Sequence, residues 1–213
     1  MITRFPTIRL EGGLISSDQI DRIADQKVKE FSIDDIAAAW SDIRSYWTLF
    51  QNSLAKLPEN DLGTSITRNR WMMPLFSTLG YDLSSPKIAA EVDGQTYAIS
   101  HRAGKDDNSP PIHIVGIRQS LDRRPESGRP RLAPHSLVQE YLNRTEHLWG
   151  IVTNGSSLRI LRDSHLMRKQ AYIEFDLEQM MKDELFADFA LLFRLIHASR
   201  LPKSDEDAST CLL

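Results

Sequence analysis

The stretch Leu148-Trp149-Gly150-Ile151-Val152-Thr153-Asn154-Gly155-Ser156-Ser157-Leu158-Arg159-Ile160-Leu161-Arg162 decides the fold class of this chain. Two apolar runs rich in β-branched residues flank an Asn-Gly pair. That pair readily adopts the backbone angles of a tight turn between antiparallel strands. The stretch therefore predicts strands over 148–153 and 158–162, joined by a turn at 154–155.

The segments on either side of this hairpin extend the same pattern. Asp93-Gly94 is a second two-residue hairpin signal, between expected strands at 88–92 and 95–102. We predict a third strand over 112–118 and a helix opened by Pro134, running to about residue 145. Another strand is expected over 171–175. Asp176 is expected to cap a final amphipathic helix that ends near residue 200.

The N-terminal third predicts helices. Gly12-Gly13 breaks any periodic pattern, so residues 1–15 are expected to form an irregular arm. Ser16 and Gln19 form a capping box for a helix reaching about residue 31. Ser32 begins a longer helix, and a third helix is expected over 64–79. Gly80 is expected to end this third helix and Pro74 to lie within it.

The longer helix carries an apolar seam that alternates steps of four and three residues. Its members are Ile36, Trp40, Ile43, Trp47, Phe50, Leu54 and Leu57. Such spacing places one apolar stripe along a helix over three heptads. Packing within the same domain and docking onto a partner segment both satisfy the pattern.

Together these elements predict a mixed α/β (α+β) fold with N-terminal helices followed by a mixed sheet flanked by helices. We assign residues 1–63 to an N-terminal arm and helical subdomain and 64–201 to the α/β core. Residues 202–213 are assigned to a polar, disordered tail. No internal repeat is found.

Composition restricts the function classes. The 213 residues are 41% hydrophobic and 26% charged, with a net charge of −3, which is ordinary for a globular protein. The only cysteine, Cys211, allows no internal disulfide, and no Cys/His cluster with zinc spacing occurs. No apolar run approaches the roughly 18 residues of a membrane span. We therefore expect a cytoplasmic protein without a metal, a cofactor or a membrane association.

The order of the expected elements, α-β-β-β-α-β, resembles the core of PD-(D/E)xK nucleases. In that fold a carboxylate on the second strand and a Glu-x-Lys on the third hold Mg²⁺ and activate water. Here Ser100 or His101 occupies the place of the first carboxylate, and Gly116-Ile117-Arg118 occupies that of Glu-x-Lys. The resemblance thus implies a restriction-endonuclease-like core with no catalytic residues.

Three further motifs extend the resemblance over roughly residues 68–200. They are Met73-Pro74-Leu75 with Leu79-Gly80-Tyr81, Val138-Gln139-Glu140-Tyr141-Leu142-Asn143, and Trp149-Gly150-Ile151-Val152-Thr153-Asn154-Gly155. They resemble the N-terminal nuclease-like segment of large restriction–modification adenine methyltransferases of phage defence. The third is also similar to the nuclease domain of type I restriction subunits. No methyltransferase motif such as Asn-Pro-Pro-Tyr occurs, so the resemblance implies no methylation by these residues.

Basic residues concentrate in the middle of the chain. Residues 101–163 carry 10 basic and 7 acidic side chains. An Arg-, Pro- and Gly-rich loop over 120–133 is expected to contact phosphates, because guanidinium groups bind phosphate oxygens bidentately. The candidate DNA-binding residues are Arg102, Arg118, Arg123, Arg124, Arg129, Arg131 and Arg144. No base-reading motif accompanies them, so binding should be weak and independent of sequence.

Three functions therefore stay open. The first is a DNA-associated, catalytically inactive module of a restriction–modification polypeptide or complex. The second is an active Mg²⁺-dependent endonuclease with rearranged ligands, for which Glu91, Asp93 and Asp122 are the displaced carboxylates. The third is a protein-interaction module that docks a larger complex through the apolar seam.

Overall fold

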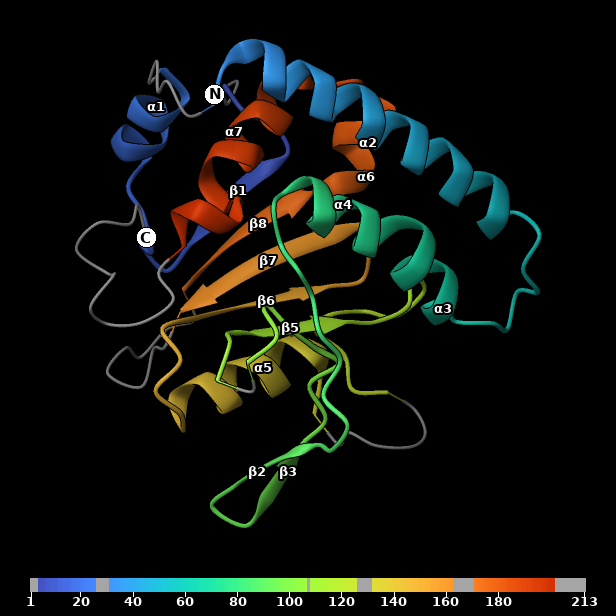
Figure 1. Cartoon of the computed structure of the whole chain (residues 1–213), viewed down its shortest axis with the longest axis vertical. Helices are drawn as coiled ribbons and strands as arrows, with labels where there is room; N and C mark the ends of the chain where they lie inside the picture. The colour runs from blue at the N-terminus through green and yellow to red at the C-terminus, as the bar shows by residue number, and fades with distance from the viewer. Residues whose placement is uncertain (1–3, 26–30, 107, 126–131, 163–170, 202–213) are drawn as a thin grey trace.

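The computed structural model describes residues 4–25, 31–106, 108–125, 132–162 and 171–201. It confirms the mixed α/β architecture: helices of the N-terminal region are followed by a six-stranded mixed sheet with helices on both faces (Figure 1). The strand order is β1-β8-β7-β6-β5-β4. β5 and β6 run parallel, and the other neighbours in this sheet are antiparallel.

The strands and helices have the following bounds, each group given in chain order. The main-sheet strands are β1 (Ile8–Glu11), β4 (His101–Arg102), β5 (Pro111–Ile114), β6 (Trp149–Thr153), β7 (Ser157–Arg162) and β8 (Tyr172–Asp176), and a separate hairpin consists of β2 (Ala90–Val92) and β3 (Gln95–Tyr97). The helices are α1 (Ser17–Asp25), α2 (Ile33–Leu54), α3 (Thr64–Ile66), the π-helix η1 (Thr67–Met72), α4 (Met73–Thr78), α5 (Pro134–Asn143), α6 (Leu177–Lys182), α7 (Phe186–Ile196) and the 3₁₀-helix η2 (Ala198–Arg200).

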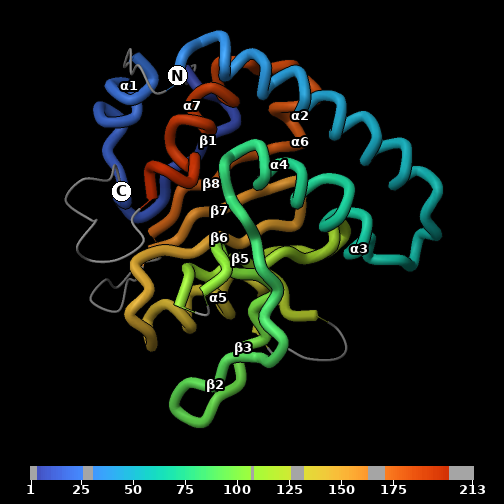
Figure 2. Tube along the Cα trace, viewed as in Figure 1, coloured from blue at the N-terminus to red at the C-terminus, as the bar shows by residue number. Residues whose placement is uncertain are grey.

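Two hydrophobic layers hold the sheet. The larger lies between the sheet and the helices α1, α2, α4 and α7, and the smaller lies between the opposite face and α5 (Figure 2). Alternation along the strands explains the division, because successive side chains point to opposite faces. Ile112 and Ile114 of β5 join the larger layer, whereas Val152 of β6 joins the smaller.

The apolar seam of α2 packs within the chain. Ile36, Ile43 and Phe50 are fully buried and Trp47 is 8% exposed. Trp47 lies 5.1 Å from the ring of Trp71, and Trp40 lies 5.0 Å from that of Phe189 of α7, between ring centroids. The intramolecular alternative is therefore confirmed, and these buried members of the seam are not available to a partner.

The structure confirms several elements that local sequence signals predicted. In the Ser16 capping box, the Gln19 amide donates to Ser16 Oγ at 3.2 Å, and the Ser16 amide donates to Gln19 Oε1 at 3.1 Å. Asp93 and Gly94 adopt φ angles of 50° and 76°, as a two-residue hairpin turn requires. Gly80 ends its helix with φ 83°.

Four expectations were wrong in detail. Residues 8–11 do not lie in an irregular arm but form β1, which pairs with β8 at one edge of the sheet. The alternation Ile-Arg-Leu-Glu was the local signal for this strand, but it is only four residues long. The expected strand 95–102 is interrupted at 98–100. Its first part forms β3, which pairs only with β2 in a separate hairpin, and its last two residues form β4 of the main sheet. The strand expected over 112–118 ends at Ile114, and the final helix divides into α6 and α7 at Glu184, whose φ is 52°.

The helix expected over 64–79 is present, but its middle is a six-residue π-helix. The Met73 amide bonds back to the carbonyl of Arg68, five residues earlier. Pro74 follows at once in the first turn of α4, where its missing amide hydrogen costs little.

The residues assigned to the helical subdomain and those assigned to the core share one hydrophobic layer. Phe31 of the first region contacts Phe193 of α7, with ring centroids 5.6 Å apart. The predicted tail, 202–213, lies outside the described residues. In the described ranges, none of the helices combines the length and the apolar character needed to cross a bilayer.

Candidate functional site

The three positions that the proposed resemblance assigns to nuclease ligands lie at the junction of β4 and β5 and in the turn after β5. Ser100 comes directly before β4. Its Oγ accepts a hydrogen bond from the Ile114 amide at 2.8 Å and lies 3.3 Å from the Ile112 carbonyl oxygen. The hydroxyl therefore bridges backbone groups of β5 where β4 no longer pairs with them. Ser100 holds two strands together.

His101 is buried beside Ser100. Its Nδ1 lies 2.8 Å from Ser100 Oγ, and the residue is 2% exposed. Burial, together with the nearby positive charge of Arg68, lowers the pKa of His101 to about 4. The imidazole is therefore neutral at physiological pH.

Gly116 stands where the glutamate of Glu-x-Lys is expected, and a side chain there would require the neighbouring backbone to shift. A Cβ atom at this position would lie 2.2 Å from the carbonyl oxygen of Leu62 and 2.9 Å from Thr64 Oγ1. The Gly116 amide donates to Gln119 Oε1 at 3.0 Å, and the Gln119 amide donates to the Gly116 carbonyl at 2.9 Å. The loop before α3 thus closes this position by direct contact with the backbone.

Arg118, in the place of the lysine, binds backbone carbonyl groups. Its Nη1 donates to the carbonyl oxygens of Asp61 at 2.7 Å and Glu59 at 3.1 Å, and also to that of Pro58. These three residues form the loop that follows α2. Arg118 therefore fastens this loop to the turn after β5.

The Asn154-Gly155 turn is a second anchor at the same end of the sheet. Trp71 of η1 donates through Nε1 to the Gly155 carbonyl at 2.8 Å. Asn154 donates through Nδ2 to the Gln119 carbonyl at 2.8 Å, while its Oδ1 accepts from the amide of Ser157. Sequence reasoning had identified only a hairpin turn here, but the turn also joins η1, the loop after β5 and β7.

The structure distributes the seven candidate arginines over different environments. Arg102 is 5% exposed, and its Nη2 donates to the Tyr141 hydroxyl at 2.9 Å. Arg144 pairs with Glu140 at 3.3 Å and with Asp93 at 3.4 Å, so that it ties α5 to the β2–β3 hairpin. Arg118 is bound as described above.

Two of the candidates are freely exposed. Arg123 and Arg124 follow Asp122 in the loop between β5 and α5. Neither makes a hydrogen bond or an ion pair with the residues that the structure describes. Arg129 and Arg131 lie outside the described residues.

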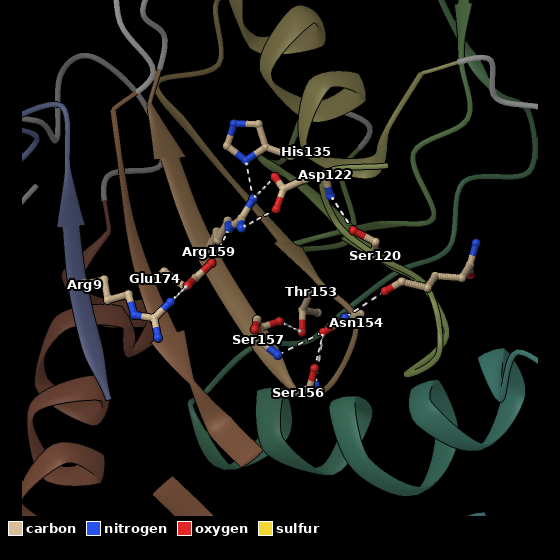
Figure 3. Close-up of polar contacts among 11 residues, drawn as sticks. Arg9, Ser120, Asp122, His135, Thr153, Asn154, Ser156, Ser157, Arg159 and Glu174 are labelled. Carbon is tan, nitrogen blue, oxygen red and sulfur yellow. Dashed lines mark hydrogen bonds and ion pairs between the residues drawn. The ribbon is translucent and has the colours of Figure 1, made fainter. Parts of the chain in front are cut away.

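A buried ion network, which sequence reasoning missed, holds this loop in place (Figure 3). Arg159 of β7 donates through Nη2 to Asp122 Oδ2 at 2.8 Å and through Nε to Glu174 Oε2 of β8 at 2.5 Å. The hydrogen bond from Arg159 lowers the pKa of Asp122, so the carboxylate stays ionised. Arg159 and Glu174 are each flanked by apolar residues in the sequence, and this pattern was the available signal for a buried charge on a strand.

The displaced carboxylates lie in different surroundings. Asp122 pairs with Arg159, and Asp93 pairs with Arg144. Glu91 is exposed on β2. Within the ranges that the structure describes, no group of three or more His, Cys, Asp or Glu side chains is able to hold a metal ion.

The opposite end of the sheet holds a cleft of about 630 Å³. Its ionisable groups are largely bound to neighbouring groups: Lys105 pairs with Asp82 at 2.9 Å, and His197 Nδ1 lies 3.0 Å from Ser199 Oγ. This cleft contains none of the candidate residues. Comparison of the chain with family models, with curated proteins and with solved structures gave no match.

Proposed function

We propose that this chain is a nuclease-like module that associates with DNA without cleaving it, as part of a cytoplasmic restriction–modification methyltransferase polypeptide or complex of phage defence. The observation that carries this proposal is the closed position at Gly116. A glutamate there would place its Cβ 2.2 Å from the Leu62 carbonyl oxygen, so a carboxylate ligand for Mg²⁺ at this position would require the Leu62 backbone to shift, which supports a module that does not cleave DNA.

The arrangement of the strands favours the nuclease-like part of this proposal. β4 and β5 are antiparallel, α5 crosses over, and β6 returns parallel to β5. The order β4-β5-α5-β6 corresponds to the last four elements of the α-β-β-β-α-β order expected from the sequence, while the β2–β3 hairpin lies outside the main sheet. Ser100 and Arg118, which the resemblance assigns to ligand positions, make contacts that hold the fold together. A fold can persist as a scaffold when its chemistry is lost.

Two exposed cations support association with DNA. Arg123 and Arg124 directly follow Asp122, which pairs with Arg159 of β7 at 2.5 Å between Oδ1 and Nη1. Exposed guanidinium groups bind phosphate oxygens, and each such contact releases counterions from the DNA. Such binding is independent of sequence and weakens as salt rises.

The test combines cleavage and binding assays on the full chain. Incubation with supercoiled plasmid in Mg²⁺ or Mn²⁺ should leave the plasmid intact. Fluorescence anisotropy with a labelled duplex should show binding at low salt. Replacing Arg123 and Arg124 by glutamine should reduce the slope of log affinity against log salt by about 1.8, at about 0.9 per contact.

Metal-dependent nicking that disappears in a Glu91→Ala/Asp122→Ala variant would refute the proposal in favour of a rearranged nuclease. A parent chain that does not bind the duplex even at low salt would refute the DNA-associated part. The protein-interaction alternative would then gain support, although the buried members of the α2 seam could not provide its surface.

A further inference from the structure

The π-helix η1 presents three consecutive polar residues to solvent. Thr67, Trp71 and Met72 form its buried side. Arg68 is half-buried, and Asn69 and Arg70 are exposed. π-helices are rare and often occur at functional sites.

Contacts with two neighbouring segments fix this unusual helix. Thr67 Oγ1 accepts a hydrogen bond from the Ile117 amide at 3.0 Å, and Trp71 donates to the Gly155 carbonyl at 2.8 Å. The outward side chains of η1 are therefore held on a rigid support at the end of the sheet. Because the helix that carries them is already ordered, less conformational entropy is lost when a partner binds.

The two arginines of η1 lack carboxylate partners in the described ranges. Arg68 makes a hydrogen bond to the neutral Asn69 Oδ1 at 3.3 Å, and Arg70 makes no hydrogen bond or ion pair with any described residue. Two exposed arginines elsewhere in the chain provide a contrast. Arg4 and Arg44 each pair with a carboxylate. The guanidinium groups of η1 are thus available to an anion.

Their position connects them to the degenerate nuclease site. The charge of Arg68 acts on His101, which lies beside Ser100, the place of a metal-binding carboxylate in the nucleases that the chain resembles. In those enzymes Mg²⁺ supplies positive charge to the phosphate there. Here the arginines of η1 bring positive charge to the same end of the sheet, where Thr67 of η1 accepts a hydrogen bond from the Ile117 amide after β5.

We propose that Arg68 and Arg70 form a second phosphate-binding patch, so that the DNA backbone crosses this end of the sheet at η1 as well as at the loop after β5. This inference rests on the DNA association proposed above. Unlike the DNA association proposed above, it places a main DNA contact on η1, outside the arginine-rich loop. Asn69, between the two arginines, offers a further hydrogen-bond donor.

The experiment compares charge-matched double variants of the full chain. Arg68→Gln/Arg70→Gln should reduce the slope of log affinity against log salt by about 1.8. The control is Arg22→Gln/Arg162→Gln, which removes two exposed cations from α1 and from the far end of β7. It should leave the slope near that of the parent. Thermal melting checks that each variant is folded.

The outcomes separate the two proposals. If the glutamine variant of η1 binds like the parent while Arg123→Gln/Arg124→Gln lowers the slope, the patch is refuted and the DNA-associated module stands. If the parent shows no salt-dependent binding, both fall. Arg68→Lys/Arg70→Lys keeps the charges and should retain most of the slope. Its full loss in a folded lysine variant would refute a phosphate patch.

Discussion

Replacing Gly116 with alanine tests the closed position directly. The new Cβ would lie 2.2 Å from the Leu62 carbonyl oxygen and 2.9 Å from the Leu62 carbonyl carbon. Cβ atoms essentially never approach other heavy atoms within 3.0 Å, so the loop must move by roughly 0.8 Å. These are backbone atoms, and no rotation of a side chain relieves the contact.

The expected loss of stability follows from two contributions. Overpacking of this kind costs about 1–3 kcal/mol. Displacement of the loop also strains the hydrogen bonds that Arg118 makes to carbonyl groups, and a typical hydrogen bond contributes about 0.5–1.5 kcal/mol. The free energy of unfolding should fall by about 2–4 kcal/mol. For a chain of this size, Tm should fall by roughly 5–15 °C.

Gly104→Ala is the matched control for thermal denaturation followed by circular dichroism. A Cβ at Gly104 would lie 2.8 Å from Ser109 Oγ, and its next contact, Ser109 Cβ, is at 3.6 Å. The hydroxyl can rotate away, so this variant should melt close to the parent. The difference between the two alanine variants isolates the effect of the Leu62 backbone.

A Gly116→Ala protein that melts like the parent would refute the reasoning, because the loop would then yield without cost. The same logic extends to function. A Ser100→Asp/Gly116→Glu variant introduces carboxylates at two positions that the resemblance assigns to metal ligands, and we expect it to be destabilised and inactive. Mg²⁺-dependent cleavage by this variant would show that the position is not closed.

The remaining predictions concern the core, the ion network and pH. Trp47→Ala removes an aromatic ring packed on Trp71 and should lower the free energy of unfolding by about 3–5 kcal/mol in urea denaturation; melting like the parent would contradict the packing. Arg159→Met leaves the buried Glu174 carboxylate with Arg9 as its remaining ion-pair partner among the described residues and should lower the free energy of unfolding by about 3–5 kcal/mol. The double variant Arg159→Met/Glu174→Leu should recover part of this loss. Equal losses in the single and double variants would argue against an ion-pair effect. Burial lowers the pKa of His147 to about 4, so the unfolded state takes up a proton before the folded state does. Stability should therefore decrease as pH falls from about 6.5 towards 4, and His147→Phe should make that decrease shallower.

The sequence by itself determined the features that depend on neighbours along the chain. Ser16 and Gln19 lie three residues apart, and Asp93 and Gly94 are adjacent, so capping and turn geometry follow from local backbone preferences. The α2 seam followed from helical periodicity, which reports the buried face of a helix but not what covers it. The mixed α/β class followed from the order of these elements.

Only the tertiary structure decided how distant segments meet. β1 was missed because its pairing with β8 joins residues more than 160 positions apart, and a four-residue strand at a sheet edge has little signal of its own. The closed position at Gly116 depends on Leu62, and the Arg159–Glu174 pair depends on the register of two strands. Of the candidate arginines, the sequence could not separate the exposed Arg123 and Arg124 from the buried Arg102. Exposure is a property of packing, and the burial of a charge is set by partners that the chain brings together only when it folds.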